Sequence, residues 1–302
     1  MNLKELARTG VRIPEVGIGT WNYHAGPAPL RRGLEAGALF LDTAPSYGTE
    51  PLIAEVIKGL RGRVFVATKV SPENFHRADL RKSVDGSLRR LGVDVIDLLQ
   101  LHAPNPATPI HETMDALGEL VDAGKVRFIG VSNFTLHQLR EAQAASPRYP
   151  IVSNQVRYNI CDRTIEGDLL PYCQAQRITV IAYSPLARGL GRIRDCDPHG
   201  VIDELVGITG RSAAQIAINW CLSKDGVVAI PKGNSVEHIL DNCAAGDWRL
   251  TAEQMARLDA HIRYRHRTRF DQLMRRWIPG PLQRAALWSV AHLPAELRRR
   301  VT

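Results

Sequence analysis

Eight short runs, mostly apolar and β-branched, alternate with longer amphipathic segments along this chain. The runs cover residues 16–21, 40–44, 64–70, 95–102, 126–132, 151–156, 179–184 and 227–231. Two of the intervening segments, 80–91 and 110–121, carry apolar residues at helical spacing. Apolar strands that alternate with helices are typical of a parallel sheet covered by helices. Eight such units within about 250 residues favour a closed (β/α)8 barrel.

The turn after the first run argues against the other common α/β fold. It reads Gly-Thr-Trp-Asn at residues 19–22 and lacks the G-x-G-x-x-G pattern of a Rossmann dinucleotide fold. Before it, segment 3–14 has a turn at Thr9 and Gly10 between short apolar stretches, which predicts a hairpin that closes the bottom of the barrel. We therefore predict an α/β protein with a (β/α)8 TIM barrel and an N-terminal β-hairpin.

The positive charge of the chain is concentrated at its C-terminus. The chain has 302 residues and a formal net charge of +8, from 39 Lys plus Arg against 31 Asp plus Glu. Residues 261–302 hold ten Arg and two acids, which leaves 29 basic and 29 acidic residues in 1–260. We expect a barrel over 1–262 and a basic helical extension over 263–302, with no nucleic-acid partner because the barrel lacks a basic stripe.

The extension has an apolar helical face before a Pro-Gly-Pro break. Its apolar residues are Phe270, Leu273, Met274, Trp277 and Ile278. A face of this kind predicts a helix that docks on the barrel. Two alternatives are an interfacial helix at a membrane surface and a segment that recruits anionic substrates.

The rest of the composition indicates a cytoplasmic protein. The N-terminus has no secretory apolar stretch, and no run approaches the ~20 apolar residues of a membrane span. Five widely spaced cysteines without a C-x-x-C pair predict reduced thiols, with neither a disulfide framework nor a metal site.

Polar side chains stand where three consecutive barrel strands are expected to end. Asp42 follows one run, Lys69 closes the next and His102 closes the third, while Tyr47 comes five residues after Asp42. Each alone has a structural explanation, such as a core histidine or a buried ion pair. Because parallel strands end at one rim, about 5 Å apart, we expect these four side chains to meet.

The four residue types suit the reduction of a carbonyl group. A buried Lys69 needs an anion, which Asp42 supplies. The ammonium beside Tyr47 is expected to lower the pKa of the phenol, so that Tyr47 donates a proton near neutral pH. A neutral His102 can hold and polarise the carbonyl oxygen.

Five ordered motifs make the chain resemble the aldo-keto reductases from about residue 16 to about residue 259. They lie at residues 42–48, 90–102, 124–134, 182–186 and 230–232. The resemblance implies that Tyr47 is the general acid, that Lys69 and Asp42 tune it, and that His102 orients an aldehyde or ketone. It also implies hydride transfer from a nicotinamide cofactor that lies across the barrel mouth.

The cofactor positions follow from the same resemblance. Ser132, Asn133 and Gln155 match residues that bind the carboxamide, and Tyr183 matches the ring that stacks on the nicotinamide. The remaining positions implied near the nicotinamide and the pyrophosphate are Gly19, Thr20, Asp42, Ser184 and Leu186. The positions implied for the adenosine clamp are Lys232, Gly233, Asn234, Ser235, His238, Asp241 and Asn242.

The clamp departs from the pattern of many NADP-selective members. Those carry Ser where Gly233 stands and Arg where His238 stands, so a permanently charged phosphate partner is absent. Lys232 and the N–H groups of a helix that starts near Ser235 replace it in part. NADPH is the expected cofactor, and NADH is possible.

The substrate pocket is expected to use Tyr47, His102, Trp21 and Ala103. Trp21 matches an aromatic wall of the pocket, although it could also pack in the core. Ala103 stands where relatives often have a large aromatic residue, which predicts an open side and tolerance of bulkier carbonyl compounds. We expect a monomer or a weak oligomer. The alternative function is a regulatory nicotinamide-binding barrel that resembles the β-subunits of potassium channels.

Overall fold

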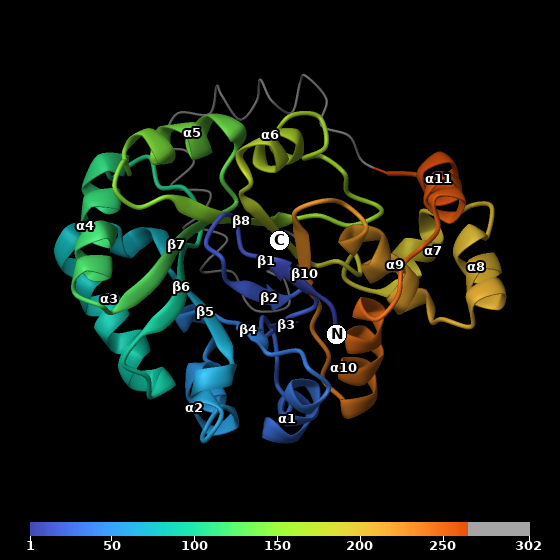
Figure 1. Ribbon diagram of the computed structural model, residues 1–302, viewed down its shortest axis with the longest axis horizontal. Coiled ribbons are helices and arrows are strands. Elements are labelled where there is room, and N and C mark those ends of the chain that lie inside the picture. The colour runs from blue at the N-terminus through green and yellow to red at the C-terminus, as the bar shows by residue number, and fades with distance from the viewer. Residues whose placement is uncertain (265–302) are drawn as a thin grey trace, which may run out of the picture. The chain divides into compact units, whose positions relative to one another are not determined.

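A computed structural model describes residues 1–264, which form a barrel of eight parallel strands (Figure 1). The strands are β3 (Ile18–Gly19), β4 (Phe40–Asp42), β5 (Phe65–Val70), β6 (Ile96–Leu101), β7 (Val126–Ser132), β8 (Ile151–Arg157), β9 (Thr179–Tyr183) and β10 (Val227–Ile230). They follow one another around the barrel in chain order. A parallel bridge between Val16 and Ala229 brings the last strand beside the first. Each of the eight predicted runs holds one strand, so the predicted barrel is confirmed.

Helices surround the strands, as Figure 1 shows. One helix follows each strand from β3 to β8: α1 (Pro27–Glu35), α2 (Glu50–Val56), α3 (Arg77–Leu91), α4 (Ile110–Asp122), α5 (Leu136–Ala144) and α6 (Leu169–Gln176). Three follow β9, namely α7 (Leu190–Asp195), α8 (Val201–Thr209) and α9 (Ala213–Leu222), and two follow β10, namely α10 (Val236–Cys243) and α11 (Ala252–His261). The two predicted helical segments lie in α3 and α4.

The predicted N-terminal hairpin is present and closes one end of the barrel. Its strands are β1 (Leu3–Glu5) and β2 (Arg12–Pro14). Leu6 and Ile13 are buried in the apolar cluster inside the barrel. The backbone N–H of Ala7 donates to Thr179 Oγ1 at 2.8 Å, at the first residue of β9. The hairpin therefore covers the amino ends of the strands and leaves the carboxyl ends open for a site.

Two apolar layers hold the barrel together. The inner layer is a small cluster that includes Phe40, Phe65 and Ile181, and the rings of Phe40 and Phe65 meet edge to face at 5.7 Å. The outer layer is larger and lies between the strands and the helices. Burial of this apolar surface is the main stabilising contribution to the fold.

The predicted basic extension lies outside the described residues from residue 265 on, because these end at Tyr264. Within the described part of the chain, no helix has the length and apolar character that a bilayer span requires.

Candidate active site

The centre of the site is a buried ion pair between two neighbouring strands. Lys69 on β5 is fully buried, and its Nζ lies 2.6 Å from Oδ1 of Asp42, the last residue of β4. Nζ also donates to the backbone carbonyl of Thr43 at 2.9 Å. Burial lowers the pKa of Lys69, but its interactions with Asp42 and Tyr47 outweigh burial, so the pKa lies above its ordinary value. The predicted pairing of the two residues is therefore present, and Lys69 is a cation.

Two amides complete the surroundings of Asp42. Its Oδ2 accepts from Nε2 of Gln155 at 2.7 Å and from Nε2 of Gln100 at 3.0 Å. Gln155, expected at the carboxamide of the cofactor, thus reaches across the barrel to the ion pair. Gln100 is fully buried beside Lys69 in the β5–β6 register. Sequence reasoning missed Gln100, although an amide inside the apolar run 95–102 was a signal for it.

Tyr47 and His102 face each other beside this ion pair. The Tyr47 hydroxyl lies 3.2 Å from Nε2 of His102, and the two rings meet edge to face with centroids 5.6 Å apart. Nζ of Lys69 lies 4.9 Å from the centre of the Tyr47 ring. Tyr47 belongs to a short 3-10 turn, η1 (Pro45–Tyr47), that directly follows β4. The four residues predicted to meet at the carboxyl ends of the strands do meet.

The expected direction of the Tyr47 pKa shift is wrong. Burial raises the pKa of Tyr47, and this effect outweighs the opposing charge of Lys69, so the pKa lies above its ordinary value. Tyr47 is therefore a protonated phenol at neutral pH. A phenol that holds its proton is still the form that a general acid needs before it reacts.

His102 is neutral, as the residue pattern predicted. Burial and the nearby charge of Lys69 lower the pKa of His102 to about 4. The ring therefore carries no charge near neutral pH, and its nitrogens can donate or accept a hydrogen bond. This state suits a residue that holds an uncharged carbonyl oxygen.

A line of hydrogen bonds extends from His102 toward β9. The backbone carbonyl of His102 accepts from Nδ2 of Asn133 at 3.1 Å, and Oδ1 of Asn133 accepts from the Tyr183 hydroxyl at 3.0 Å. Ser132 is buried, and its hydroxyl donates to the backbone carbonyl of Gln155 at 2.9 Å. The structure therefore groups four positions expected at the nicotinamide, and Ser132 fixes β7 against β8.

The loop after β9 has an unusual backbone. Ser184, Ala187 and Arg188 are non-glycine residues with φ of 51°, 51° and 71°. Such conformations cost energy and concentrate at functional sites. The loop is held by Asn159, whose Nδ2 donates to the carbonyl of Ser184 at 3.0 Å. Ser184 and the half-buried Leu186 lie in this loop, where the pyrophosphate was expected.

Gly19 and Thr20, both expected at the cofactor, have contacts that shape the barrel. A Cβ on Gly19 would lie 2.8 Å from the carbonyl oxygen of Ile230, so only glycine allows β3 to approach β10 this closely. Thr20 is fully buried, and its hydroxyl donates to the backbone carbonyl of Asp42 at 2.9 Å. The buried hydroxyl of Thr20 is therefore occupied within the protein.

The predicted clamp lies at the start of α10. Ser235 is the N-cap, as expected from the sequence, and its hydroxyl accepts from the backbone N–H of His238 at 3.1 Å. The side chains of Lys232 and His238 are exposed. A Cβ on Gly233 would lie 2.9 Å from Cγ1 and 3.0 Å from the backbone nitrogen of Ile239, so close packing of the loop on α10 explains why a serine does not stand there.

The other clamp residues make contacts within the protein. The side chain of Asn234 lies 3.2 Å from Nε2 of His24, in the loop after β3. Both oxygens of Asp241 accept hydrogen bonds from the start of α9, from Ser212 at 2.8 Å and from Gln215 at 2.7 Å. Asn242 is buried. Contacts of Asp241 and Asn242 with adenine stay a prediction.

Trp21 and Ala103, the two positions expected to line the wall of the substrate pocket, are more exposed than core residues. Trp21 is 48% exposed in the loop after β3, so core packing does not explain it. Ala103 directly follows His102 and is partly buried. Their contacts with a substrate stay a prediction.

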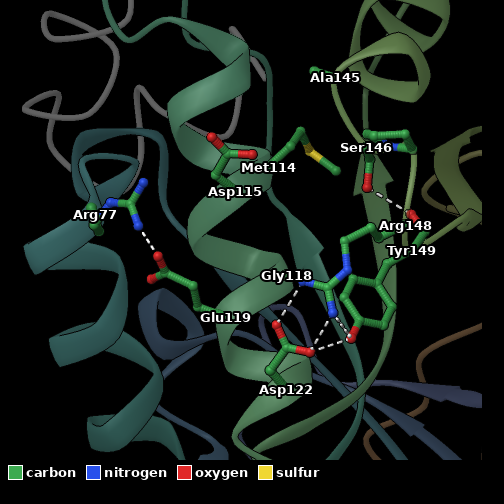
Figure 2. Close-up of a pocket in the computed structure, with 11 residues that line it drawn as sticks. Arg77, Met114, Asp115, Gly118, Glu119, Asp122, Ala145, Ser146, Arg148 and Tyr149 are labelled. Carbon is green, nitrogen blue, oxygen red and sulfur yellow. Dashed lines mark hydrogen bonds and ion pairs between the residues drawn. The ribbon is translucent and has the colours of Figure 1, made fainter.

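A pocket of about 270 Å³ lies away from these residues, on the outer face of the barrel (Figure 2). Figure 2 shows two ion pairs among its side chains, Arg77 with Glu119 and Arg148 with Asp122. Arg148 binds Asp122 at 2.9 Å, the Tyr149 hydroxyl donates to Asp122 at 2.5 Å, and Arg77 pairs with Glu119. None of the predicted site residues lines it, and we assign it no role in the reaction.

Comparison with known proteins identifies the family. Residues 15–263 match the model of the aldo/keto reductase family. The methylglyoxal reductase YeaE of Escherichia coli is 37% identical over 260 residues, which cover 82% of this chain and 91% of that relative. The chain therefore belongs to the aldo-keto reductase family, and it is an oxidoreductase.

Solved structures agree with this assignment. The thermostable aldo-keto reductase Tm1743 is 40% identical with a TM-score of 0.81, over 86% of this chain and 99% of that one. An aldo/keto reductase from Klebsiella pneumoniae, crystallised with NADP and acetate, is 37% identical with a TM-score of 0.78, over 85% and 94% of the two chains.

Proposed function

We propose that this enzyme reduces an aldehyde or ketone to an alcohol with NADPH, and that Tyr47 supplies the proton. The observation that carries the proposal is the geometry around Tyr47, whose hydroxyl lies 3.2 Å from Nε2 of His102, beside the buried Lys69–Asp42 pair. A carbonyl oxygen between Tyr47 and His102 would receive a hydrogen bond from each. A positioned acid of this kind contributes about 10²- to 10⁴-fold to a rate.

Each residue of the group has a separate part in this proposal. Tyr47 gives its phenolic proton to the carbonyl oxygen as negative charge develops there. Lys69 then stabilises the phenolate that remains, because opposite charges attract strongly in a buried site. Asp42 keeps Lys69 in place, and neutral His102 orients the substrate oxygen. The same groups in reverse would remove the proton from an alcohol.

The residues at the barrel mouth fit a nicotinamide dinucleotide phosphate. The positive-φ loop from Ser184 to Arg188 suits a pyrophosphate, and the exposed Lys232 with the N-terminus of α10 suits a 2′-phosphate. Tyr183, Asn133 and Gln155 would lie at the nicotinamide. The cofactor supplies the hydride when it is bound. The Klebsiella pneumoniae structure with NADP, and a second aldo-keto reductase structure from the same organism with NADPH, support this assignment.

The proposed substrate class rests on the small side chain expected at Ala103 and on the relatives. The methylglyoxal reductase from Escherichia coli makes methylglyoxal the first compound to test. A panel of small dicarbonyls, aliphatic and aromatic aldehydes, ketones and sugars with NADPH and NADH tests the proposal. We expect NADPH oxidation with at least one aldehyde. Tight NADPH binding without reduction of any carbonyl would instead support the regulatory β-subunit alternative.

Three further expectations stay predictions. They are the cytoplasmic location, the monomeric or weakly associated state, and the division of the chain into a barrel over 1–262 and an extension over 263–302.

His238→Arg is expected to strengthen NADPH binding about tenfold and to leave NADH binding within about twofold. An arginine adds a permanent charge beside the 2′-phosphate, and a hydrogen bond to a charged group contributes about 1.5–3 kcal/mol. Fluorescence titrations with both cofactors check this. Equal changes for NADPH and NADH would remove His238 from the phosphate site.

The rate of carbonyl reduction at saturating NADPH is expected to stay flat between about pH 5 and about pH 9. The lowered pKa of His102, about 4, keeps the ring neutral above pH 5, and the raised pKa of Tyr47 keeps the phenol protonated on the alkaline side. Steady-state kcat across this range checks the prediction. A tenfold change centred near pH 6.5, the ordinary value for histidine, would contradict the buried state of His102.

A further inference from the structure

Three buried threonines form a chain of hydrogen bonds beneath the loop that carries Tyr47. Oγ1 of Thr43 lies 2.8 Å from Oγ1 of Thr49, which lies 2.9 Å from Oγ1 of Thr20. The Thr20 hydroxyl donates to the backbone carbonyl of Asp42 at 2.9 Å. Thr20 and Thr43 are fully buried, and Thr49 is 5% exposed. The three hydroxyls therefore connect the two ends of the Tyr47 loop, Thr43 and Thr49, in an almost fully buried position.

The direction of each hydrogen bond in this chain is determined. A backbone carbonyl only accepts, so the single proton of Thr20 is used on Asp42. Thr20 must then accept from Thr49, and Thr49 must accept from Thr43. All three protons point toward Asp42, and hydrogen bonds ordered in this way strengthen one another.

The capping position of Thr49 gives a second, independent observation. Thr49 is the N-cap of α2, where a threonine side chain usually accepts a hydrogen bond from the first turn of the helix. Here the Thr49 side chain makes no such bond. Its hydroxyl contacts Thr20 and Thr43 and is therefore used within the threonine chain.

The hydrogen-bonded threonines and Lys69 hold the backbone on both sides of Tyr47. On one side, the carbonyl of Asp42 accepts from Thr20, and the carbonyl of Thr43 accepts from Nζ of Lys69 at 2.9 Å. On the other side, Thr49 is two residues from Tyr47, across Gly48, which has a φ of +71°. A shift of Thr49 would be passed through this short connection to the phenol.

We propose that Thr49 is a positioning residue for Tyr47, which acts through the ordered chain of hydroxyls and does not contact the substrate. This inference rests on the proposed function, in which Tyr47 is the proton donor. The Thr49 hydroxyl is then needed for the rate of the chemical step, because a reacting group such as Tyr47 that is displaced by about 1 Å can lose about 100-fold in rate. The binding of cofactor and substrate should depend on it much less.

Thr49→Val tests this role because valine keeps the shape of threonine and lacks the hydroxyl. We expect kcat for carbonyl reduction to fall about 10- to 100-fold, with KM for the carbonyl within about threefold. Thr49→Ser restores the hydroxyl and is expected to keep kcat within about threefold of the unmodified protein. A T49V enzyme with unchanged kcat, or an equal loss in T49S, would overturn the proposal.

A matched control separates positioning from general stability. Thr113 on α4 is also fully buried, and its hydroxyl donates to the backbone carbonyl of Phe75 at 3.2 Å. Thr113→Val is expected to lower Tm by a few degrees and to leave kcat unchanged. A T113V enzyme that loses kcat as T49V does would show that any buried hydroxyl has this effect, and would overturn the specific role of Thr49.

Two further variants cover the remaining outcomes. If T49V does not fold, Thr43→Val removes only the first hydroxyl, and we expect kcat to fall about two- to fivefold because the other bonds weaken. An unchanged kcat in T43V would then overturn the proposal that the hydrogen-bonded threonines position Tyr47. Tyr47→Phe is measured in the same series. Full activity in Y47F would overturn the proposed function itself, whereas loss in Y47F with full activity in T49V would overturn only the role of Thr49.

Discussion

Tyr47→Phe is expected to lower kcat for carbonyl reduction about 10²- to 10⁴-fold and to leave the affinity for NADPH within about twofold. The substitution removes the hydroxyl that lies 3.2 Å from Nε2 of His102, and phenylalanine keeps the ring in its place. Burial holds the pKa of Tyr47 above its ordinary value, so the unmodified residue has its proton available at neutral pH. Steady-state rates of NADPH oxidation and fluorescence titrations of NADPH check the two parts.

A second tyrosine provides the control for this variant. Tyr149 lies in the outer pocket, and its hydroxyl donates to Asp122 (Figure 2). Tyr149→Phe removes the same atom from a place without a predicted site residue, and kcat is expected to stay unchanged. If Y47F keeps more than about a tenth of the original kcat, Tyr47 is not the general acid.

Lys69→Met is expected to lower both stability and activity. It leaves the buried carboxylate of Asp42 without its cation, and breaking a buried ion pair costs about 3–5 kcal/mol of unfolding free energy. Asp42 keeps the amide donors Gln100 and Gln155, so the lower part of this range applies. We expect kcat to fall at least about 100-fold, because the phenolate of Tyr47 loses its neighbouring charge. Urea denaturation and steady-state kinetics measure the two losses.

The stability loss of K69M has a defined pH dependence. The pKa of Lys69 in the folded protein is raised above its ordinary value, so its charge stabilises the fold fully below the unfolded pKa. That contribution is lost only as the pH rises through the folded pKa. The difference between K69M and the unmodified protein should therefore be constant between about pH 6 and about pH 9.

A double variant separates the ion pair from the proposed catalytic role of Lys69. Asp42→Asn in the K69M background removes the unpaired charge, so we expect part of the unfolding free energy to return while kcat stays low. Equal stability of K69M and the unmodified protein would contradict a buried, charged pair. Recovery of kcat in the double variant would remove Lys69 from the proton-transfer step.

The barrel was predictable from the sequence because apolar runs and amphipathic segments alternate regularly along it. A buried parallel strand needs a continuous apolar run, and each of the eight runs holds one strand. The hairpin was predictable for the same reason, since a turn at Thr9 and Gly10 separates two short apolar stretches. The extra helices α7 and α8 after β9 were not expected, because insertions in loops follow no fixed repeat.

The candidate site was predictable only where the residue type and its position at or shortly after a strand end carried the signal. Asp42, Tyr47, Lys69 and His102 met these conditions. The inward-facing Gln100 did not, because one amide within an apolar run does not show which side chain it reaches.

Long-range contacts and burial account for the other differences. The hydroxyl chain of Thr20, Thr43 and Thr49 joins residues up to 29 positions apart. The direction of the Tyr47 pKa shift depends on burial, which a list of neighbouring charges does not contain. The reason for Gly233, a close approach to Ile239, likewise required the packed structure.

The most direct test of the central proposal is a single turnover of the enzyme with bound NADPH. Enzyme in excess over NADPH is mixed with methylglyoxal, or with the best aldehyde of the panel, and the absorbance of NADPH is followed while the product is identified. The proposed function predicts one alcohol formed for each NADPH oxidised, with a rate that falls about 10²- to 10⁴-fold in Y47F. NADPH that stays bound and reduced with every carbonyl compound, or oxidation at the same rate in Y47F, would contradict it.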